Sequence, residues 1–312
     1  MIRYVSNLTA DWVARRIPKR PENANKGTFG KVLVIAGSAS YPGAAYLSCA
    51  AAYRVGAGLV TLASIKPVCD FVIKKLPEVT LIPFPEKDGA ISEQSVNQLT
   101  EPSWAGLTNF SEEDVVLFGP GLTTKDSVIE FTEKLLKRYD LPRFVIDGDG
   151  LNVLSKIKNW WQELEDYGIY MVLTPHPGEM SRLTGLSIKK IQSKRQEVAE
   201  EYASRVWGKT VVLKGSETII ASPVGEVKVS PFVNPLLSTA GTGDVLSGII
   251  AGLWTQGLDT NYGFDAACSG VYIHGLAGQM LKEKLGDRGM LASEMLPVLP
   301  QAIKKLKMSI DK

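Results

Sequence analysis

The chain has 312 residues, of which 45% are hydrophobic and 22% charged, so it can bury one large core or two modest ones. Its 35 Lys and Arg residues against 33 Asp and Glu residues leave a formal net charge of +2, which excludes the strong positive field of a protein that holds nucleic acid or an anionic membrane surface. The N-terminus has no apolar signal-peptide core, and no segment reaches the roughly 18 apolar residues of a membrane span. We expect a globular protein with neither nucleic acid nor membrane as partner.

Cysteine and histidine usage predicts a reducing compartment and no structural metal. The three cysteines, Cys49, Cys69 and Cys268, form no Cys-x-x-Cys pair, and their odd number leaves no disulfide framework. The two histidines, His176 and His274, lie too far apart along the chain for a His-x-x-x-His pair. We therefore expect a cytoplasmic protein.

Residues 1–25 are predicted to form an N-terminal arm, and residues 26–312 a single domain. The arm gathers four basic residues in a segment that also contains Pro and Asn, which is typical of a solvated surface segment: Arg15, Arg16, Lys19 and Arg20. Such an arm could also cover a neighbouring subunit. No linker or internal repeat divides the rest of the chain.

From residue 26 onward, short apolar runs that end in loop residues alternate with longer segments of helical spacing. The runs predict strands over 32–36, 59–63, 115–118, 144–146, 171–173 and 210–213, followed by a hairpin of 218–221 and 227–230. The clearest helices are expected over 44–55, 127–138, 188–207, 245–255 and about 264–284. This alternation is typical of an α/β fold with a mainly parallel central sheet flanked by helices.

Small and polar residues follow most of the predicted strands. They occur at 37–45, 119–121, 147–152, 174–179 and 214–215. Ligands of open α/β sheets bind beyond the carboxyl ends of the strands. These segments are therefore expected to meet around one pocket for a flat, phosphate-bearing molecule.

The segment Gly241-Thr242-Gly243-Asp244 runs directly into the apolar helix expected from residue 245. Its two glycines let the backbone curl and bring N–H groups close to a phosphate, and the positive end of the helix dipole favours negative charge there. The Asp244 carboxylate at this junction would act as a general base or, in the plainer interpretation, as the helix N-cap. The neighbouring residues favour the base.

Other positions also have both a structural and a site interpretation. His176, held between two prolines in a loop after a strand, is too polar and rigid for core filling and is interpreted as a site residue. His274 is interpreted as structural, because it shares a helix face with small residues that permit close packing. Asp147, Asp149 and Asn152 either end a strand and cap the next helix or orient Mg²⁺ and phosphate, and the sequence leaves that choice open.

The ordered set of motifs resembles the ribokinase-like NAD(P)H-hydrate dehydratases, which repair damaged nicotinamide nucleotides. The resemblance covers nearly the whole chain, through the segments 26–38, 42–45, 119–121, 147–152, 174–179, 212–215 and 241–244. A lone Gly-Thr-Gly-Asp indicates only a ribokinase-like kinase, whereas Pro-His-Pro-Gly-Glu and Lys-Gly-Thr-Phe-Gly are far more specific. The chain departs from the family pattern at Asn25, where histidine is usual, at Ala36, where glycine is usual, and at Gly148 and Gly150, where alanines are usual.

The resemblance implies a single ribokinase-like domain that uses ADP or ATP, with Mg²⁺, to dehydrate the S-form of NADH hydrate and NADPH hydrate. The hydrate hydroxyl would be phosphorylated and phosphate would then leave, with AMP or ADP as the nucleotide product. Asp244 is the implied catalytic base, and no protein ligand of Mg²⁺ is assigned. The residues implied to bind the hydrate are Ala45, Gly121, Asn152, His176 and Asp244, and those implied to bind the adenine nucleotide are Lys214, Gly215, Ser216, Glu217, Thr218, Gly241, Thr242 and Gly243.

Members of this family are often fused to an epimerase that interconverts the two hydrate stereoisomers, so the resemblance implies a separate epimerase as pathway partner. The apolar, small-residue helix from residue 264 and the arm favour a homo-oligomer, with a tetramer as the expected form. Two alternatives remain. A small-molecule kinase of the hydroxyethylthiazole or hydroxymethylpyrimidine type would release a stable phosphorylated product, and a nucleotide-binding sensor would bind without turnover.

Overall fold

Ten strands form one central sheet in the computed structural model, which describes residues 4–100, 111, 114–137, 143–165, 169–258 and 262–308. In order across the sheet they are β1 (Tyr4–Asn7), β12 (Glu226–Val229), β11 (Ile219–Ala221), β10 (Thr210–Leu213), β9 (Tyr170–Leu173), β8 (Arg143–Ile146), β7 (Val115–Phe118), β2 (Lys31–Ile35), β3 (Leu59–Ile65) and β4 (Thr80–Phe84). Neighbouring strands are parallel, except that β11 runs antiparallel to both β10 and β12. The predicted mainly parallel sheet is confirmed. A separate antiparallel pair joins β5 (Glu86–Lys87) and β6 (Ala90–Ile91).

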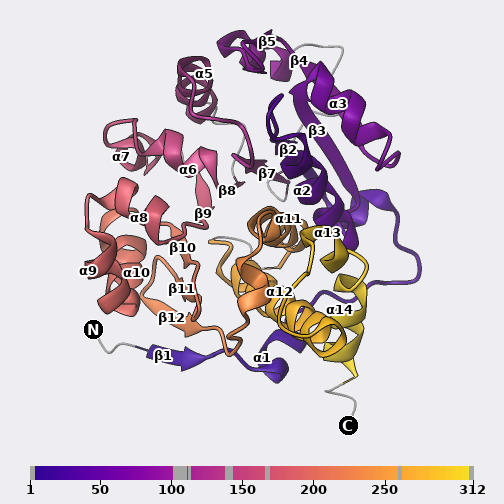
Figure 1. The fold of residues 1–312 in the computed structure, drawn as a ribbon, viewed down its shortest axis with the longest axis vertical. Helices are drawn as coiled ribbons and strands as arrows, with labels where there is room; N and C mark the ends of the chain where they lie inside the picture. Colours follow the sequence, from indigo (N-terminus) through magenta and orange to yellow (C-terminus); the bar gives the residue numbers. More distant parts are fainter. Residues whose placement is uncertain are drawn as a thin grey trace.

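Helices cover both faces of the sheet (Figure 1). One layer contains α2 (Pro42–Arg54), α3 (Lys66–Ile73), α11 (Thr242–Trp254), α12 (Phe264–Leu285), α13 (Ala292–Met295) and α14 (Leu299–Lys307), with the short α1 (Ala10–Ala14) against α12 and α14. The opposite layer contains α5 (Asp126–Leu136), α6 (Asp149–Leu154), α7 (Trp160–Glu165), α8 (Pro177–Thr184), α9 (Ile188–Ser193) and α10 (Arg195–Glu201). Short 3₁₀ turns lie at Lys26–Phe29, Glu93–Thr100 and Pro235–Ser238.

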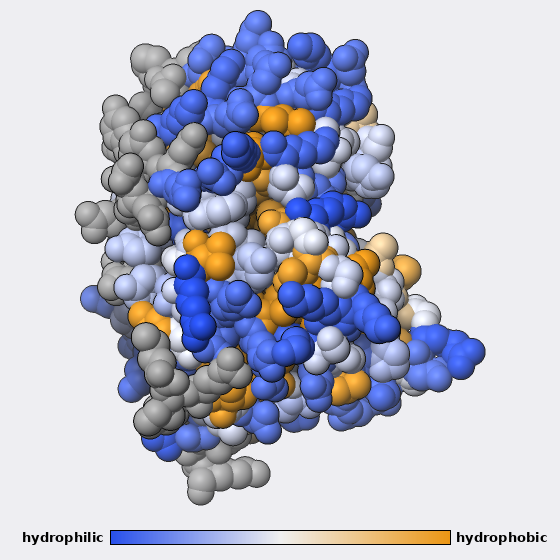
Figure 2. Space-filling model, turned by 90° about the vertical axis from the view of Figure 1, so that its left-hand side faces the viewer, coloured by the Kyte–Doolittle hydropathy of each residue, from blue (hydrophilic) through white to orange (hydrophobic). Residues whose placement is uncertain are grey.

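Figure 2 shows the outer side of the second layer, where hydrophilic residues dominate and apolar ones are scattered in small groups. The apolar side chains are instead collected in one continuous core around the sheet, in which Val32, Val145 and Val172 have no exposed surface. Among the described residues, no helix is both long and apolar enough to cross a membrane.

The predicted helix over 188–207 is not one helix. Lys194 adopts φ −138° and ψ 40°, outside the helical region, and separates α9 from α10. The last part, Tyr202–Val206, continues α10 as a π-helical turn. Helical periodicity alone does not mark such a break, because the residues on both sides keep good helix propensity. By contrast, the predicted hairpin is confirmed as β11 and β12.

The prediction of a solvated N-terminal segment is wrong for residues 4–14. β1 pairs in parallel with β12, and the Leu8 amide donates to the carbonyl of Val229 at 2.9 Å. Leu8 and Val13 are buried in the core. The hairpin strand β12 would otherwise present an open edge, and β1 covers it. The division of the chain at residue 25 remains a prediction.

Among the described helices, the most extensive contact joins α2 and α11, and the start of α11 lies at the centre of the molecule. Gly248 and Gly252 face α2, where a Cβ on Gly248 would lie 2.9 Å from the Cβ of Ala51. α11 also packs on β7 and β8. The small residues therefore let α11 lie between α2, α12 and the sheet, with its N-terminus at the carboxyl ends of the strands.

Candidate active site

The glycine loop adopts the backbone that the sequence predicts. Gly241 has φ +90°, a conformation that favours glycine, and a Cβ there would lie 2.7 Å from a methyl group of Leu47. The Thr242 hydroxyl donates at 2.8 Å to the carbonyls of Leu237 and Thr239 and fixes the turn before α11. Gly241 is the N-cap of α11. Asp244 is therefore the third residue of the helix, and the alternative that it serves as N-cap is wrong.

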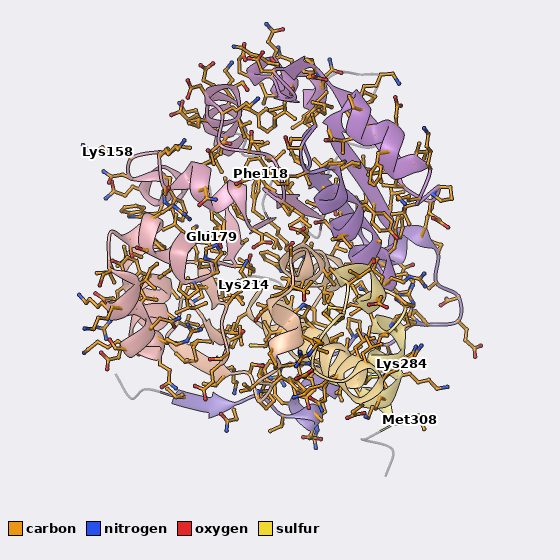
Figure 3. All side chains as sticks on the ribbon, viewed as in Figure 1. Phe118, Lys158, Glu179, Lys214, Lys284 and Met308 are labelled. Atoms are coloured by element: carbon orange, nitrogen blue, oxygen red, sulfur yellow. The ribbon has the colours of Figure 1, made fainter. Side chains whose placement is uncertain are left out.

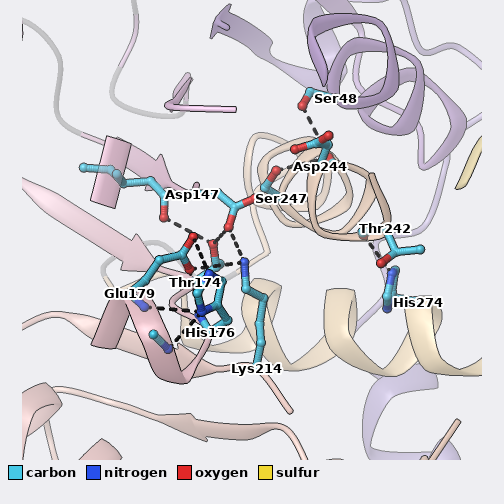
Figure 4. A network of polar contacts seen from close by, with 12 residues as sticks. Ser48, Asp147, Thr174, His176, Glu179, Lys214, Thr242, Asp244, Ser247 and His274 are labelled. Carbon is cyan, nitrogen blue, oxygen red and sulfur yellow. Dashed lines mark hydrogen bonds and ion pairs between the residues drawn. The ribbon is translucent and has the colours of Figure 1, made fainter. Parts of the chain in front are cut away.

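An ion-paired cluster lies next to this loop (Figure 4). The Lys214 ammonium group, which follows β10, lies 2.5 Å from Asp147 Oδ1 and 3.7 Å from Glu179 Oε2. The hydroxyl of Thr174, which follows β9, donates to Asp147 Oδ1 at 2.7 Å. Asp147 and Glu179 are buried, and Figure 3 shows Glu179 and Lys214 near the centre of the molecule. Three neighbouring strand ends thus bring opposite charges together beside the start of α11.

The acidic residues after β8 do not cap the next helix through their side chains. Gly148 is the N-cap of α6 and makes no side-chain capping hydrogen bond. Asp149 Oδ2 instead accepts from the Thr123 amide at 2.8 Å, and Asn152 Oδ1 accepts from the Arg182 guanidinium group at 3.0 Å. The helix-capping alternative is therefore wrong for these residues.

His176 has a structural contact in addition to its position in the site. Its Nδ1 accepts hydrogen bonds from the amides of Gly178 and Glu179 at 2.9 and 3.3 Å and so caps α8, while its own amide donates to Glu179 Oε2. The hydrogen of the neutral ring must then sit on Nε2. Burial, with Lys214 and Arg182 nearby, lowers the pKa of His176, so the ring is neutral at pH 7. Its Nε2, which carries the hydrogen, lies 3.3 Å from Glu179 Oε1 and could donate to a ligand in the same cavity.

Two carboxyl groups of the site have pKa values near neutrality. Burial raises the pKa of Asp244 to about 7, and the charge of Asp147 adds to the shift while Lys214 opposes it. Burial likewise raises the pKa of Glu179 to about 7, against the opposing effect of Lys214. Burial alone would lower the pKa of Lys214, but Asp147 and Glu179 raise it above its ordinary value. A carboxylate near pKa 7 is suited to accept a proton at physiological pH.

Two cavities meet at the start of α11. One, of about 800 Å³, is lined by Asp244 and by residues from the loops and first helical turns after β2, β7, β8 and β9, which include Tyr41, Ala44, Gly121, Asp149, Asn152, His176 and Glu179. The other, of about 540 Å³, is lined by Thr242 and Gly243, by Lys214, Gly215, Ser216 and Thr218, and by an apolar wall that includes Phe232, Pro235 and Leu237. The two sets share no residue, although Gly243 and Asp244 are adjacent.

The structure brings most of the predicted site residues to these cavities. Gly121, Asn152, His176 and Asp244 line the larger one, whereas Ala45 is fully buried behind its neighbour Ala44. The nucleotide set lines the smaller one except for Glu217 and Gly241, which lie in the same two loops. The sequence placed segment 174–179 at the pocket and left the role of Asp147 open, but it assigned no role to Thr174 or Glu179 and missed the apolar wall. Asp147 and Thr174 directly follow a strand, and Glu179 lies in α8 six residues after β9; that position was the signal that could have given them a role.

His274 is buried between helices, as the sequence predicts, and it also forms a hydrogen bond to the glycine loop. It is buried in α12, and its Nε2 lies 3.0 Å from the Thr242 carbonyl. Burial lowers its pKa to about 4, so the neutral ring donates to that carbonyl. Through this bond His274 also holds the glycine loop and borders the smaller cavity.

A protein-family model described as NAD(P)H-hydrate dehydratase matches residues 32–301. The chain belongs to this family. A bifunctional NAD(P)H-hydrate repair enzyme of Moorella thermoacetica is 39% identical over 305 residues, which cover 97% of this chain and 55% of that protein. An ADP-dependent (S)-NAD(P)H-hydrate dehydratase of Bacillus subtilis is 31% identical over 302 residues, which cover 96% of this chain and 98% of that protein. The chain spans about half the length of the bifunctional relatives that it matches.

Solved structures confirm the fold expected of this family. The Bacillus subtilis ADP/ATP-dependent NAD(P)H-hydrate dehydratase, co-crystallised with ATP and Mg²⁺, superposes with a TM-score of 0.78 at 29% identity, covering 96% of this chain and 97% of that chain. A ribokinase-like superfamily protein of Enterococcus faecalis superposes with a TM-score of 0.74 at 26% identity, covering 97% of this chain and 96% of that chain. The predicted single-chain ribokinase-like architecture is confirmed.

Proposed function

We propose that this protein restores NADH and NADPH from the S-form of their hydrates, with ADP or ATP as the phosphoryl donor. The observation that carries the proposal is the Asp244 carboxylate, whose pKa is raised to about 7 and which lies where two separate cavities meet at the start of α11. The family and the names of relatives of this chain favour this activity over that of a small-molecule kinase.

The two cavities suit the two substrates. We assign the hydrate to the 800 Å³ cavity, where Gly121, Asn152 and His176 lie with Asp244, and where a neutral His176 can donate to an amide or phosphate oxygen. We assign the adenine nucleotide to the 540 Å³ cavity, with its phosphates toward Thr242, Gly243 and Lys214. Ala45 then supports the hydrate cavity from behind, and Glu217 and Gly241 support the nucleotide cavity.

The chemistry needs one base and one phosphoryl transfer. Asp244 accepts the proton of the hydrate hydroxyl, whose oxygen attacks the terminal phosphorus while the bond to the nucleotide leaving group breaks. Amides at the start of α11 and the Lys214 ammonium group stabilise the charge on the transferred group. The C–O bond of the phosphorylated hydrate then breaks, phosphate leaves, and loss of a proton from the neighbouring carbon restores the ring double bond. With ADP, the products are AMP, phosphate and NADH or NADPH.

The described residues contain no group of three or more His, Cys, Asp or Glu side chains placed to hold a metal ion. They do fit Mg²⁺ held mainly by phosphate oxygens and water, which needs only one or two carboxylates. Asp147 is placed for this role, because its Oδ2 would lie 3.7 Å from a Cβ on Gly243. When bound, the ion would neutralise charge on the nucleotide phosphates.

We further propose a cytoplasmic homo-oligomer, a tetramer by preference, that acts with a separate hydrate epimerase. All three cysteines are free and buried, which suits a reducing compartment. The relatives described as bifunctional repair enzymes are about twice as long as this chain and indicate that a second repair activity accompanies the first. Light scattering of the purified protein tests the oligomeric state.

The direct test measures recovery of the reduced-nicotinamide absorbance from NADH hydrate with Mg²⁺ and either ADP or ATP. Asp244→Asn is expected to lower kcat by about 10²- to 10⁴-fold with hydrate binding retained. Asp70→Asn, a surface carboxylate on α3 paired with Lys66, is the matched control and should retain full activity. Accumulation of a stable phosphorylated product would instead support the kinase, and an Asp244→Asn variant with full activity would exclude Asp244 as the base.

A further inference from the structure

The turn that follows β10 lines the smaller cavity, and a single side chain from the other helix layer holds it. Arg195 is the first residue of α10. Its Nη2 lies 2.9 Å from the Leu213 carbonyl, 3.2 Å from the Lys214 carbonyl and 2.9 Å from the Glu217 carbonyl. Two hydrogens are thus shared among three acceptors, so one of the bonds is three-centred. One guanidinium group therefore joins both ends of the turn.

The fit between Arg195 and the turn is close. A Cβ on Gly215 would lie 2.6 Å from Nη2 and 2.9 Å from Cζ, so any side chain there would have to displace the guanidinium group. Nη1 donates to Gln192 Oε1 at 2.7 Å, which anchors the planar group from α9. The break between α9 and α10 at Lys194 precedes Arg195 directly.

In the turn after β10, most carbonyl groups accept hydrogen bonds from the protein, whereas two amide groups have no protein acceptor among the described residues. Arg195 donates to three carbonyls, and the Thr218 hydroxyl donates to a fourth, of Gly215, at 3.3 Å. The Lys214 amide donates to the Pro175 carbonyl. Within the part of the chain that the structure describes, the amides of Gly215 and Ser216 have no such acceptor, and both residues line the cavity. These N–H groups are free for a ligand that accepts hydrogen bonds.

We propose that Arg195 is a positioning residue for the adenine nucleotide, which acts from behind the turn by holding the Gly215 and Ser216 amides open to the smaller cavity. The proposal rests on the proposed function, because it assumes that the nucleotide occupies this cavity. Arg195 does not itself line that cavity and lines a separate polar one of about 320 Å³ on the other side of the turn. Replacing Arg195 should therefore weaken the binding of the nucleotide but not that of the hydrate.

The test compares Arg195→Met, which keeps the length of the side chain but removes the donors, with Arg195→Lys, which keeps a cation with three donors. Lys194→Met is the matched control, since Lys194 pairs with the exposed Glu197 on the surface. ADP affinity is measured by calorimetry with Mg²⁺, and the KM of each substrate and kcat are measured by hydrate turnover. Thermal unfolding of each variant shows whether it is folded.

Arg195→Met is expected to weaken ADP binding and raise the nucleotide KM by about tenfold or more, as loss of hydrogen bonds to a charged group implies. The hydrate KM should change less than about twofold, because Arg195 contacts the turn at the nucleotide cavity and does not line the hydrate cavity. Arg195→Lys, which keeps a charged donor, should recover part of the lost ADP affinity. Unchanged ADP affinity in folded Arg195→Met, or an equal rise in both KM values, would overturn the positioning role. Calorimetry keeps the two proposals distinguishable: a wild-type protein that binds ADP but does not restore NADH would overturn the proposed reaction alone.

Discussion

At the scale of single residues, the raised pKa of Asp244 predicts how activity depends on pH. As the proposed base, Asp244 must be deprotonated to accept the hydroxyl proton, and burial raises its pKa to about 7. We therefore expect kcat/KM to rise tenfold per pH unit below about pH 7 and to level off above it. Rate measurements between pH 5 and 9 test this. A plateau that begins near pH 4, the range of an ordinary aspartate, would contradict it.

The raised pKa of Asp244 affects stability in the opposite direction from activity, because the free energy of unfolding should fall as pH rises. In the unfolded chain Asp244 has its ordinary pKa of 3.8, whereas in the folded protein the pKa is about 7. The folded state therefore holds its proton more tightly, and stability falls as pH rises from about 4 to about 7. Asp244→Asn removes this cost, so it should raise the free energy of unfolding at pH 8, by up to about 4 kcal/mol as an upper bound.

Chemical denaturation at pH 8 and pH 4 measures that effect. The gain should be large at pH 8 and close to zero near pH 4, where the Asp244 carboxyl is protonated in the folded state. Asp70→Asn, exposed on α3, should show no such dependence. An equal gain at both pH values would indicate that packing is responsible and not ionisation.

At the scale of elements, the contact between α2 and α11 sets the position of Asp244, the proposed base. Asp244 and Gly248 are four residues apart and lie on the same side of α11, and Ser48 of α2 donates to the Asp244 carbonyl at 3.3 Å. Gly248→Ala should push the helices apart because the new Cβ meets the Ser48 carbonyl. We expect a loss of about 1–3 kcal/mol in unfolding free energy, together with a lower kcat.

Gly43→Ala is the control for this substitution. Gly43 also lies in α2, but a Cβ there would meet no atom within 4 Å. Alanine favours helix by up to about 1 kcal/mol over glycine, so the control should keep or slightly raise stability. Equal losses in both variants, measured by urea denaturation, would show that glycine in these helices has a role other than close packing.

Particular elements show why sequence analysis predicted some parts of this fold and not others. β2, β7 and β10 are runs of β-branched and aromatic residues bounded by loop residues, so composition alone identifies them. β1 has four residues and is stabilised by pairing with β12, whose position depends on the whole sheet. For the same reason the sequence suggested Asp244 and His176 but did not show that Lys214 pairs with both Asp147 and Glu179, which come from different strand ends.

At the scale of the whole molecule, we expect the first residues of the described chain to unfold in the same transition as the site, because Leu8 packs in the common core. Leu8 is 2% exposed, and Leu8→Ala should lower the free energy of unfolding by about 2–5 kcal/mol. Activity at 25 °C should be unchanged, because β1 lies at the far edge of the sheet from α11. Val5→Ala, at a position 41% exposed, is the control and should have little effect. Equal stability of both variants would indicate that β1 detaches before the core unfolds.

The two cavities share no lining residue, and this predicts the kinetic pattern of turnover. In the proposed assignment each substrate has a cavity of its own, so neither has to leave before the other binds, and no protein nucleophile is needed to carry the phosphoryl group between them. Transfer then requires both substrates at once, so double-reciprocal plots against one substrate at several fixed levels of the other should intersect. Parallel lines, the pattern of a ping-pong reaction, would mean that one product departs before the second substrate arrives.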